Sequence, residues 1–227
     1  YPLVTLVGEG GIGKTRLALA VAERIQTQFT DGVWFVPLVG LTPMANLSES
    51  LAAAIGATLK LTFTGTASLQ AQLLQHLQAK ALLLILDNFE QHIAGVDFIL
   101  ELLQATQAVK ILVTSRQRLN LYGEYVYRLD GLPVPDTEAS KLLQTTSLLT
   151  YPSIQLFIER AERTTPGFEL TAANQLDVVR ICRFVEGLPL GIELAAALIE
   201  QYDGATIATA LTAGYATLTT DLVGLPS

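Results

Sequence analysis

The sequence predicts an α/β domain built on a parallel sheet, followed by a smaller unit made only of helices. Apolar runs that suit buried strands alternate with helical segments up to Asp130, and the runs stop there. A Gly-rich loop joins the first strand to the first helix. Half of the 227 residues are apolar, which is enough for a sizeable core.

Five segments are expected to be strands, and the central ones are apolar without alternation, as in parallel strands buried on both faces. They are Leu3–Val7, Val33–Leu38, Leu82–Leu86, Ile111–Thr114 and Tyr125–Leu129. Helices are expected between most of them, at Arg16–Gln28, Asn46–Ile55, Ser68–Gln78 and Val96–Thr106. The alternation predicts a doubly wound sheet flanked by helices.

The organisation changes after residue 130. We expect residues 1–130 to form the α/β domain, residues 131–136 (Gly-Leu-Pro-Val-Pro-Asp) a stiff linker and residues 137–227 a helical subdomain. Both ends look cut, so we expect a segment of a longer protein, with the helical subdomain truncated at its C-terminal end. Its helices are expected at Glu138–Leu149, Ser153–Thr164, Ala172–Val185, Pro189–Tyr202 and Ala205–Leu211.

Capping signals mark the ends of these helices. Thr171 is expected to be an N-cap, and Pro152 and Pro189 lie where first-turn prolines are tolerated. Gly187 is expected to cap the preceding helix at its C-terminus.

The loop after the first strand carries the clearest chemical signal. It reads Gly-Glu-Gly-Gly-Ile-Gly-Lys-Thr and matches G-x-x-x-x-G-K-S/T, in which backbone N–H groups and a helix N-terminus surround a phosphate chain. Lys14 is expected to neutralise the β- and γ-phosphates and Thr15 to offer its hydroxyl to Mg²⁺. The alternative is an ordinary Gly-rich turn. The expected nucleotide-binding residues here are Gly8, Glu9, Gly10, Gly11, Ile12, Gly13, Lys14, Thr15 and Arg16.

An acid ends the third strand, in the segment Leu-Leu-Leu-Ile-Leu-Asp-Asn-Phe-Glu. Asp87 is expected to hold Mg²⁺, through water, or alternatively to be a turn residue. Glu90 is the carboxylate best placed to orient or deprotonate a water, but it also reads as a solvated acid that opens the next helix. Asn88 cannot act as a base, although it can orient a water or a metal-bound oxygen.

Arg116 follows the fourth strand, in Ile-Leu-Val-Thr-Ser-Arg. At that strand end it could reach a γ-phosphate and stabilise charge during its transfer, or remain a surface arginine.

The remaining signals exclude several classes of function. The net charge of −7 argues against direct nucleic-acid binding, and no apolar run is long enough to cross a membrane. Cys182 is the only cysteine, which fits a cytoplasmic location. His76 and His92 are isolated, so no cluster has metal-ligand spacing, and Trp34 is expected in the core.

The order of these motifs, together with Gly-Leu-Pro-Leu at 187–190, resembles the NB-ARC-type nucleotide-binding domain of the signal-transduction (STAND) P-loop ATPases, as found in bacterial multidomain transcriptional regulators. The resemblance covers nearly the whole chain. It implies an ASCE-type sheet, with the phosphate-loop strand between the strands of the later motifs, and an ARC1-like bundle. It also implies that Arg116 senses the γ-phosphate and that Pro189 contacts the nucleotide. Where relatives have an acid pair, this chain has Asp87-Asn88, with Glu90 beyond.

We therefore expect an ATP/ADP-binding switch with Mg²⁺ and slow hydrolysis, in which Lys14, Asp87, Glu90 and Arg116 act catalytically. In the longer protein, with adjoining sensor and effector domains, the ATP state is expected to form homo-oligomers. The alternatives are a nucleotide-binding module without turnover and a P-loop phosphotransferase.

Overall fold

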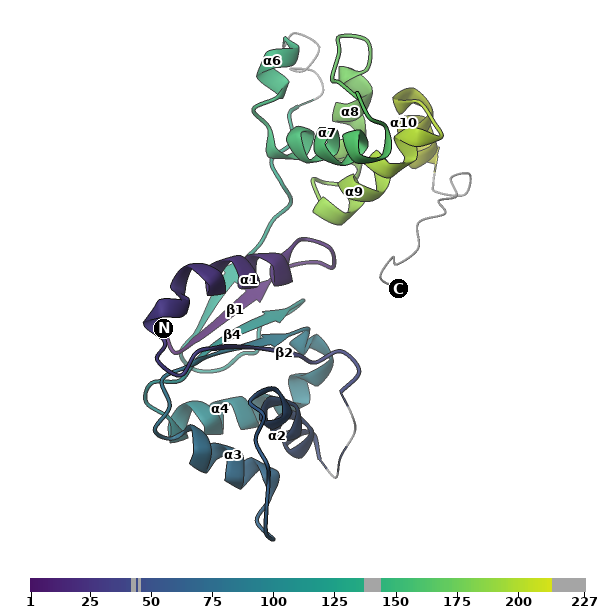
Figure 1. Cartoon of the computed structure of the whole chain (residues 1–227). Helices are drawn as coiled ribbons and strands as arrows, with labels where there is room; N and C mark the ends of the chain where they lie inside the picture. The colour runs from purple at the N-terminus through teal and green to yellow at the C-terminus, as the bar shows by residue number, and fades with distance from the viewer. Residues whose placement is uncertain (42–43, 45, 137–143, 214–227) are drawn as a thin grey trace. The chain divides into compact units, whose positions relative to one another are not determined.

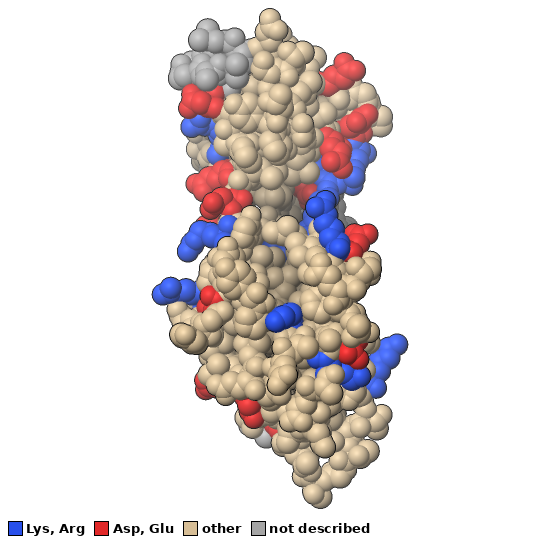
Figure 2. Space-filling view, turned by 90° about the vertical axis from the view of Figure 1, so that its left-hand side faces the viewer, with Lys and Arg blue, Asp and Glu red and all other residues tan. Residues whose placement is uncertain are grey.

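The computed structural model describes residues 1–41, 44, 46–136 and 144–213. The chain divides into two compact units, Tyr1–Leu129 and Asp130–Ser227 (Figure 1). Uncharged residues cover most of the face shown in Figure 2, as expected for a chain with only 15% charged residues. None of the described helices is both long and apolar enough to span a membrane.

The first unit is built on a five-stranded sheet in the order β2-β3-β4-β1-β5, with every neighbouring pair parallel. Its strands are β1 (Leu3–Val7), β2 (Val33–Pro37), β3 (Leu83–Asp87), β4 (Lys110–Ser115) and β5 (Glu124–Arg128). The predicted P-loop NTPase fold is confirmed, and β1 lies between β4 and β5 as the resemblance implied. Strand β2 differs from the prediction by one residue at one end, and β3, β4 and β5 differ by one residue at both ends.

The register brings the carboxyl ends of the strands to one edge of the sheet. Val7, the last residue of β1, pairs with Ser115 on one side and with Arg128 on the other. Leu86 of β3 pairs with Val113 of β4. The segments that follow β1, β3 and β4 therefore leave the sheet close together, although they are far apart in sequence.

Helices cover both faces of this sheet (Figure 1): α1 lies on one face, and α2, α3 and α4 lie on the other. Their bounds are α1 (Lys14–Ile25), η1 (Gln26–Gln28), α2 (Leu47–Thr58), α3 (Leu69–Leu77), η2 (Phe89–Gly95) and α4 (Val96–Ala105). Asn46 and Ser68, predicted as first helical residues, are N-caps whose side chains accept the N–H groups of Glu49 and Ala71.

Each face of the sheet has its own apolar core. Leu84 and Leu86 of β3 pack with α2, α3 and α4, whereas Ile85 packs with α1, because successive strand residues point to opposite faces. A hollow of about 880 Å³ opens on the α1 face and is lined mainly by apolar side chains, including Leu17 and Tyr125. None of the phosphate-loop residues lines this hollow. The candidate site is therefore identified from the loop and its neighbours, and not from the hollow.

Helices are the only regular secondary structure in the described part of the second unit. It contains α6 (Thr145–Leu148), α7 (Pro152–Thr164), α8 (Gln175–Phe184), α9 (Pro189–Ala197), η3 (Leu198–Glu200) and α10 (Gly204–Ala213). Pro152 and Pro189 are first-turn residues, as predicted. Part of the helix predicted at Glu138–Leu149 lies outside the described residues.

The prediction that Thr171 is an N-cap is wrong. Helix α8 begins after Asn174, three residues later than predicted. The reason is a local turn: the Asn174 side chain accepts the Thr171 N–H at 2.8 Å, and the Thr171 carbonyl accepts the Asn174 N–H at 3.2 Å. Asn side chains favour such turns over helix interiors.

Helix α8 ends in a Schellman turn that is formed by two left-handed residues. Glu186 (φ 52°) donates its N–H to Arg183 O, and Gly187 (φ 68°) donates to Cys182 O. Val185 is the C-cap residue, and the left-handed residue directly after it is Glu186. The sequence predicts Gly187, one residue later, as the capping residue. The turn also holds the preceding segment, because Leu132 donates its N–H to Gly187 O at 2.8 Å.

Cys182 is fully buried in the core of the second unit. Burial raises the pKa of its thiol to about 12. We expect the native thiol to react with a disulfide reagent at pH 8 roughly a thousandfold more slowly than in guanidinium, since the thiolate is the nucleophile. Equal rates in the two conditions would show that the thiol is accessible.

The raised pKa of Cys182 also affects stability. As pH rises above the ordinary thiol pKa, the unfolded chain loses this proton before the folded chain does, so the free energy of unfolding should fall.

Candidate functional site

The predicted phosphate loop connects β1 to α1 and carries two glycines with positive φ. Gly11 has φ 75° and Gly13 has φ 97°, and Gly13 is the residue that precedes the first turn of α1. Only glycine adopts such angles without strain. The Ile12 side chain is buried and holds the loop against the domain, while Glu9 and Gly10 are exposed. The loop thus presents its backbone at the N-terminus of a helix.

Lys14 points back over this loop. Its ammonium donates to Gly8 O and to Glu9 O, both at 2.8 Å, and the residue is only 7% exposed. Burial lowers the pKa of Lys14, and the nearby Arg116 lowers it further, whereas Glu90 and Asp87 act in the opposite direction. A buried ammonium satisfied only by neutral carbonyls is well placed to take an anionic partner.

Asp87, the last residue of β3, lies directly beside the loop. Its Oδ1 accepts two hydrogen bonds of 2.7 Å, one from the Thr15 hydroxyl and one from the Thr114 hydroxyl. Asp87 is 8% exposed and Thr114 is fully buried. The contact between Thr15 and Asp87 joins the two residues predicted to hold Mg²⁺, although 72 positions separate them.

Glu90 and Arg116 meet at the same edge of the sheet. Arg116 Nε lies 3.3 Å from Glu90 Oε1, and the side chain of Glu90 is only 17% exposed. Its second oxygen, Oε2, is buried without a hydrogen-bond partner among the described residues. Glu90 is therefore not a fully solvated acid, and its role as a site carboxylate stays a prediction. A Cβ placed on Gly10 would lie 3.5 Å from Arg116 Nη2, so the guanidinium also reaches the loop.

The oxygen atoms of Thr15 and Asp87 fit a Mg²⁺ ion that is also bound by phosphates and water, and not a metal ion bound by protein side chains alone. Thr15 and Asp87 supply adjacent oxygen atoms, which are the ligands that Mg²⁺ prefers. In the part of the chain that the structure describes, no group of three His, Cys, Asp or Glu side chains could hold a metal ion. A Mg²⁺ ion here would keep waters and take phosphate oxygens from a nucleotide, as is usual for this ion.

The structure does not test the predicted binding roles of Arg16 and Pro189. Arg16 is exposed on α1. Pro189 begins α9 in the second unit, and its role stays a prediction. Sequence reasoning singled out the segment that ends in Arg116 but gave Thr114 no role. A hydroxyl residue at the end of an otherwise apolar strand is the signal that could have identified it.

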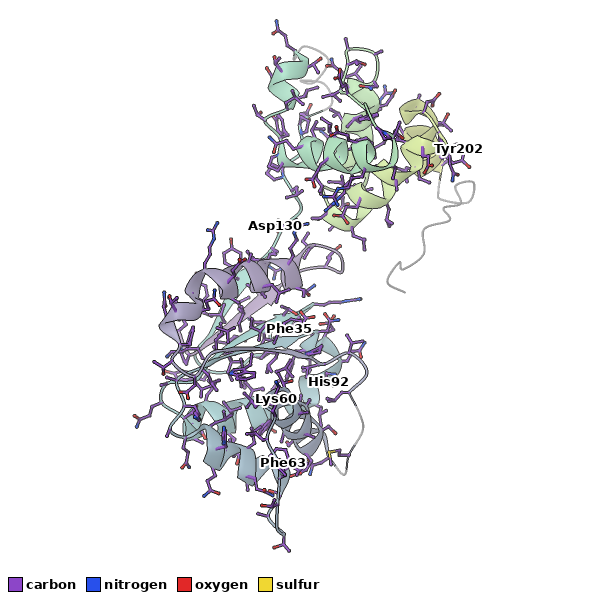
Figure 3. All side chains as sticks on the ribbon, viewed as in Figure 1. Phe35, Lys60, Phe63, His92, Asp130 and Tyr202 are labelled. Carbon is purple, nitrogen blue, oxygen red and sulfur yellow. The ribbon has the colours of Figure 1, made fainter. Side chains whose placement is uncertain are left out.

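The two histidines and the tryptophan lie outside this group of residues. His92 (Figure 3) places Nε2 3.0 Å from Leu38 O and so links η2 to the segment after β2. His76 is exposed on α3. Trp34 packs partly buried against the core, as predicted, and its Nε1 donates to Asp31 O.

Residues 2–122 match the family model described as an AAA domain, which is more than half of the chain. The sequence is 33% identical over 210 residues to Rv0890c of Mycobacterium tuberculosis, which bears the provisional name of an HTH-type transcriptional regulator. It is 31% identical over 199 residues to Regulatory protein AfsR of Streptomyces griseus. These matches cover 92% and 84% of this chain but only 21% and 18% of the relatives. The chain spans about a fifth of their length.

Among solved structures, Cdc6p from Pyrobaculum aerophilum shares the fold, with a TM-score of 0.54 and 18% identity over 94% of this chain and 57% of that chain. This level of identity supports the fold alone. The chain belongs to the AAA domain family. The prediction of a P-loop ATPase-type domain is thus confirmed, and its assignment to the NB-ARC type stays a prediction.

Proposed function

We propose that this member of the AAA domain family is the nucleotide-dependent switch of a longer regulatory protein, of the NB-ARC type. It binds ATP and ADP with Mg²⁺, hydrolyses ATP slowly and assembles into homo-oligomers in its ATP state. The observation that carries the proposal is the pair of Glu90 and Arg116 beside the phosphate loop, because a charge pair at that place can distinguish ATP from ADP.

The phosphate chain is held by the loop and Lys14. The ammonium turns from the Gly8 and Glu9 carbonyls to the phosphates, exchanging neutral acceptors for anionic ones. Thr15 and Asp87 would hold Mg²⁺, which would supply charge neutralisation at the phosphates. The hydrogen bond between these two residues keeps their oxygen atoms together before any ligand arrives.

The γ-phosphate and Glu90 compete for Arg116. An arginine that binds a phosphate oxygen weakens its 3.3 Å pair with Glu90, and only ATP offers that phosphate. Glu90 then accepts a proton from a water whose oxygen attacks the γ-phosphorus while the bond to the ADP oxygen breaks. Hydrolysis is slow because Glu90 must leave its ion pair first, and because Asn88 cannot serve as a second acid.

The comparisons support a regulatory role for the longer protein. The two relatives named above carry the names of regulators and are about five times longer than this chain, which leaves room for sensor and effector domains. We propose that Pro189 contacts the nucleotide from the helical subdomain, that the segment itself does not bind nucleic acid, and that the protein is cytoplasmic.

A nucleotide-binding module without turnover is the second candidate. The engagement of Glu90 by Arg116 and the presence of Asn88 after Asp87 favour it. Calorimetry with ATP and ADP, beside a phosphate-release assay, separates the two candidates. Binding with slow release supports the switch, and binding without release supports the module. Transfer of phosphate to an added small molecule would favour a phosphotransferase instead.

Arg116→Ala is expected to leave ADP affinity unchanged and to lower the ratio of ATP to ADP affinity about tenfold, the effect of one hydrogen bond to a charged group. The matched control is Arg118→Ala, which removes an exposed arginine two residues further along the chain. Calorimetric titration of both variants with each nucleotide makes the measurement. An unchanged ratio in Arg116→Ala would remove the sensor role.

A further inference from the structure

We infer that Thr114 is a positioning residue for the candidate site: its hydroxyl fixes the Asp87 carboxylate and, at the same time, the start of the segment that carries Glu90. This inference rests on the proposed function, because it assigns a task within the same site. Thr114 lies near the end of β4, next to the end of β3, and is fully buried.

Two short contacts define the arrangement. The Thr114 hydroxyl lies 2.7 Å from Asp87 Oδ1, and the Asn88 N–H donates to Thr114 Oγ1 at 3.0 Å. One side chain on β4 thus contacts consecutive residues at the end of β3. Asn88 has φ 63° and directly precedes η2, the short helix that contains Glu90.

The two contacts determine where the hydroxyl proton points. A threonine hydroxyl has one proton to donate and lone pairs to accept with. Since the Asn88 N–H occupies a lone pair, and an ionised Asp87 can only accept, the proton must lie on the line to Asp87. The backbone of Asn88 therefore orients the donor that holds Asp87.

The consequence concerns the free oxygen of Asp87. Thr15 and Thr114 both donate to Oδ1, and among the described residues no hydrogen bond reaches Oδ2. Two donors on one oxygen fix the rotation of the carboxylate and would leave the other oxygen available when Mg²⁺ binds. Residues that orient a metal-binding carboxylate in this way typically change metal affinity 10- to 100-fold when they are mutated.

The chain offers a matched control in Thr5. It is also fully buried, and it lies in β1, the strand next to β4, paired with Val113. Its Oγ1 has no hydrogen-bond partner among the described residues. Thr5→Val and Thr114→Val therefore make the same chemical change at the same burial, and only the second removes hydrogen bonds.

The test compares Thr114→Val, Thr114→Ser and Thr5→Val with the parent. The first measurement is the ratio of ATP affinities with Mg²⁺ and with EDTA. The second is amide hydrogen exchange at Asn88 without nucleotide. Thr114→Val is expected to lower the Mg²⁺-dependent gain in affinity about tenfold or more and to speed Asn88 exchange. Thr114→Ser should restore both, and Thr5→Val should match the parent or be slightly more stable.

The outcomes separate this inference from the proposed function. If Thr114→Val keeps the Mg²⁺ response and the Asn88 exchange rate of Thr5→Val, Thr114 is an ordinary core residue and the inference is overturned. If Thr114→Val is only less stable, with an unchanged Mg²⁺ response, its role is structural and the inference also fails. If the parent itself binds no ATP, the proposed function fails at that step, before any variant is compared.

Discussion

Replacing Lys14 with alanine is expected to weaken the binding of ATP and ADP at least 100-fold while the fold is retained. The buried ammonium is the group that the loop holds ready for phosphates, at 2.8 Å from two of its own carbonyls. Hydrogen bonds to charged groups contribute about 1.5–3 kcal/mol each, so losing one of them lowers affinity about tenfold or more. Losing several such bonds to the phosphates should therefore lower affinity by a larger factor. The fold should persist because Gly8 and Glu9 lie in a surface loop, where water can replace the lost donor.

Lys80→Ala is the control for this variant. Lys80 also uses its ammonium, in a 2.9 Å ion pair with Asp31, but it lies away from the loop and is more exposed. Its removal should leave nucleotide affinity unchanged. Circular dichroism and calorimetry of both variants make the comparison. Parent-like affinity in folded Lys14→Ala protein would show that the loop is an ordinary Gly-rich turn.

Replacing Gly187 with alanine is expected to destabilise the second unit by about 3 kcal/mol. Two costs combine at this residue. A side chain at φ 68° costs roughly 1–2 kcal/mol. The added Cβ would also lie 2.1 Å from Leu132 O, a backbone atom that moves only if the segment hydrogen-bonded to Gly187 is displaced. Such overpacking typically costs about 1–3 kcal/mol.

Gly167→Ala separates these two costs. Gly167 lies in the same unit with φ 87°, and nothing lies within 4 Å of its Cβ position, so the variant keeps the backbone strain and lacks the clash. Denaturant unfolding of both variants should show the larger loss for Gly187→Ala. Equal losses would mean that the turn does not hold Leu132. The glycine of the Gly-Leu-Pro-Leu motif would then be required for its positive φ alone.

Most of the fold could be predicted from local patterns in the sequence. Apolar runs located all five strands to within one residue at each end. In β1, β3 and β4, burial on both faces leaves few polar positions to blur the limits, whereas β5 is mostly exposed. The predicted start of α8 was wrong because Thr171 and Asn174 are both residue types that commonly cap helices. Which of them caps is decided by an interaction of the Asn174 side chain with Thr171 that no pattern records.

The candidate site was less predictable. The loop motif located Lys14 and Thr15, and strand ends located Asp87 and Arg116. The partners of these residues depend on the order β2-β3-β4-β1-β5, which aligns residues distant in sequence. That order brings Arg116 within 3.3 Å of Glu90, although it leaves the role of Glu90 a prediction. It also placed Thr114 against Asp87.

We expect the edge of the sheet at residues 8–15 to bind nucleotide and to distinguish ATP from ADP. The most direct measurement is calorimetric titration of this chain with ATP in Mg²⁺ and, separately, with ADP. One saturable site is expected for each nucleotide, with dissociation constants that differ between the two. Folded protein that gives no binding heat with either nucleotide, or the same dissociation constant for both, would contradict it.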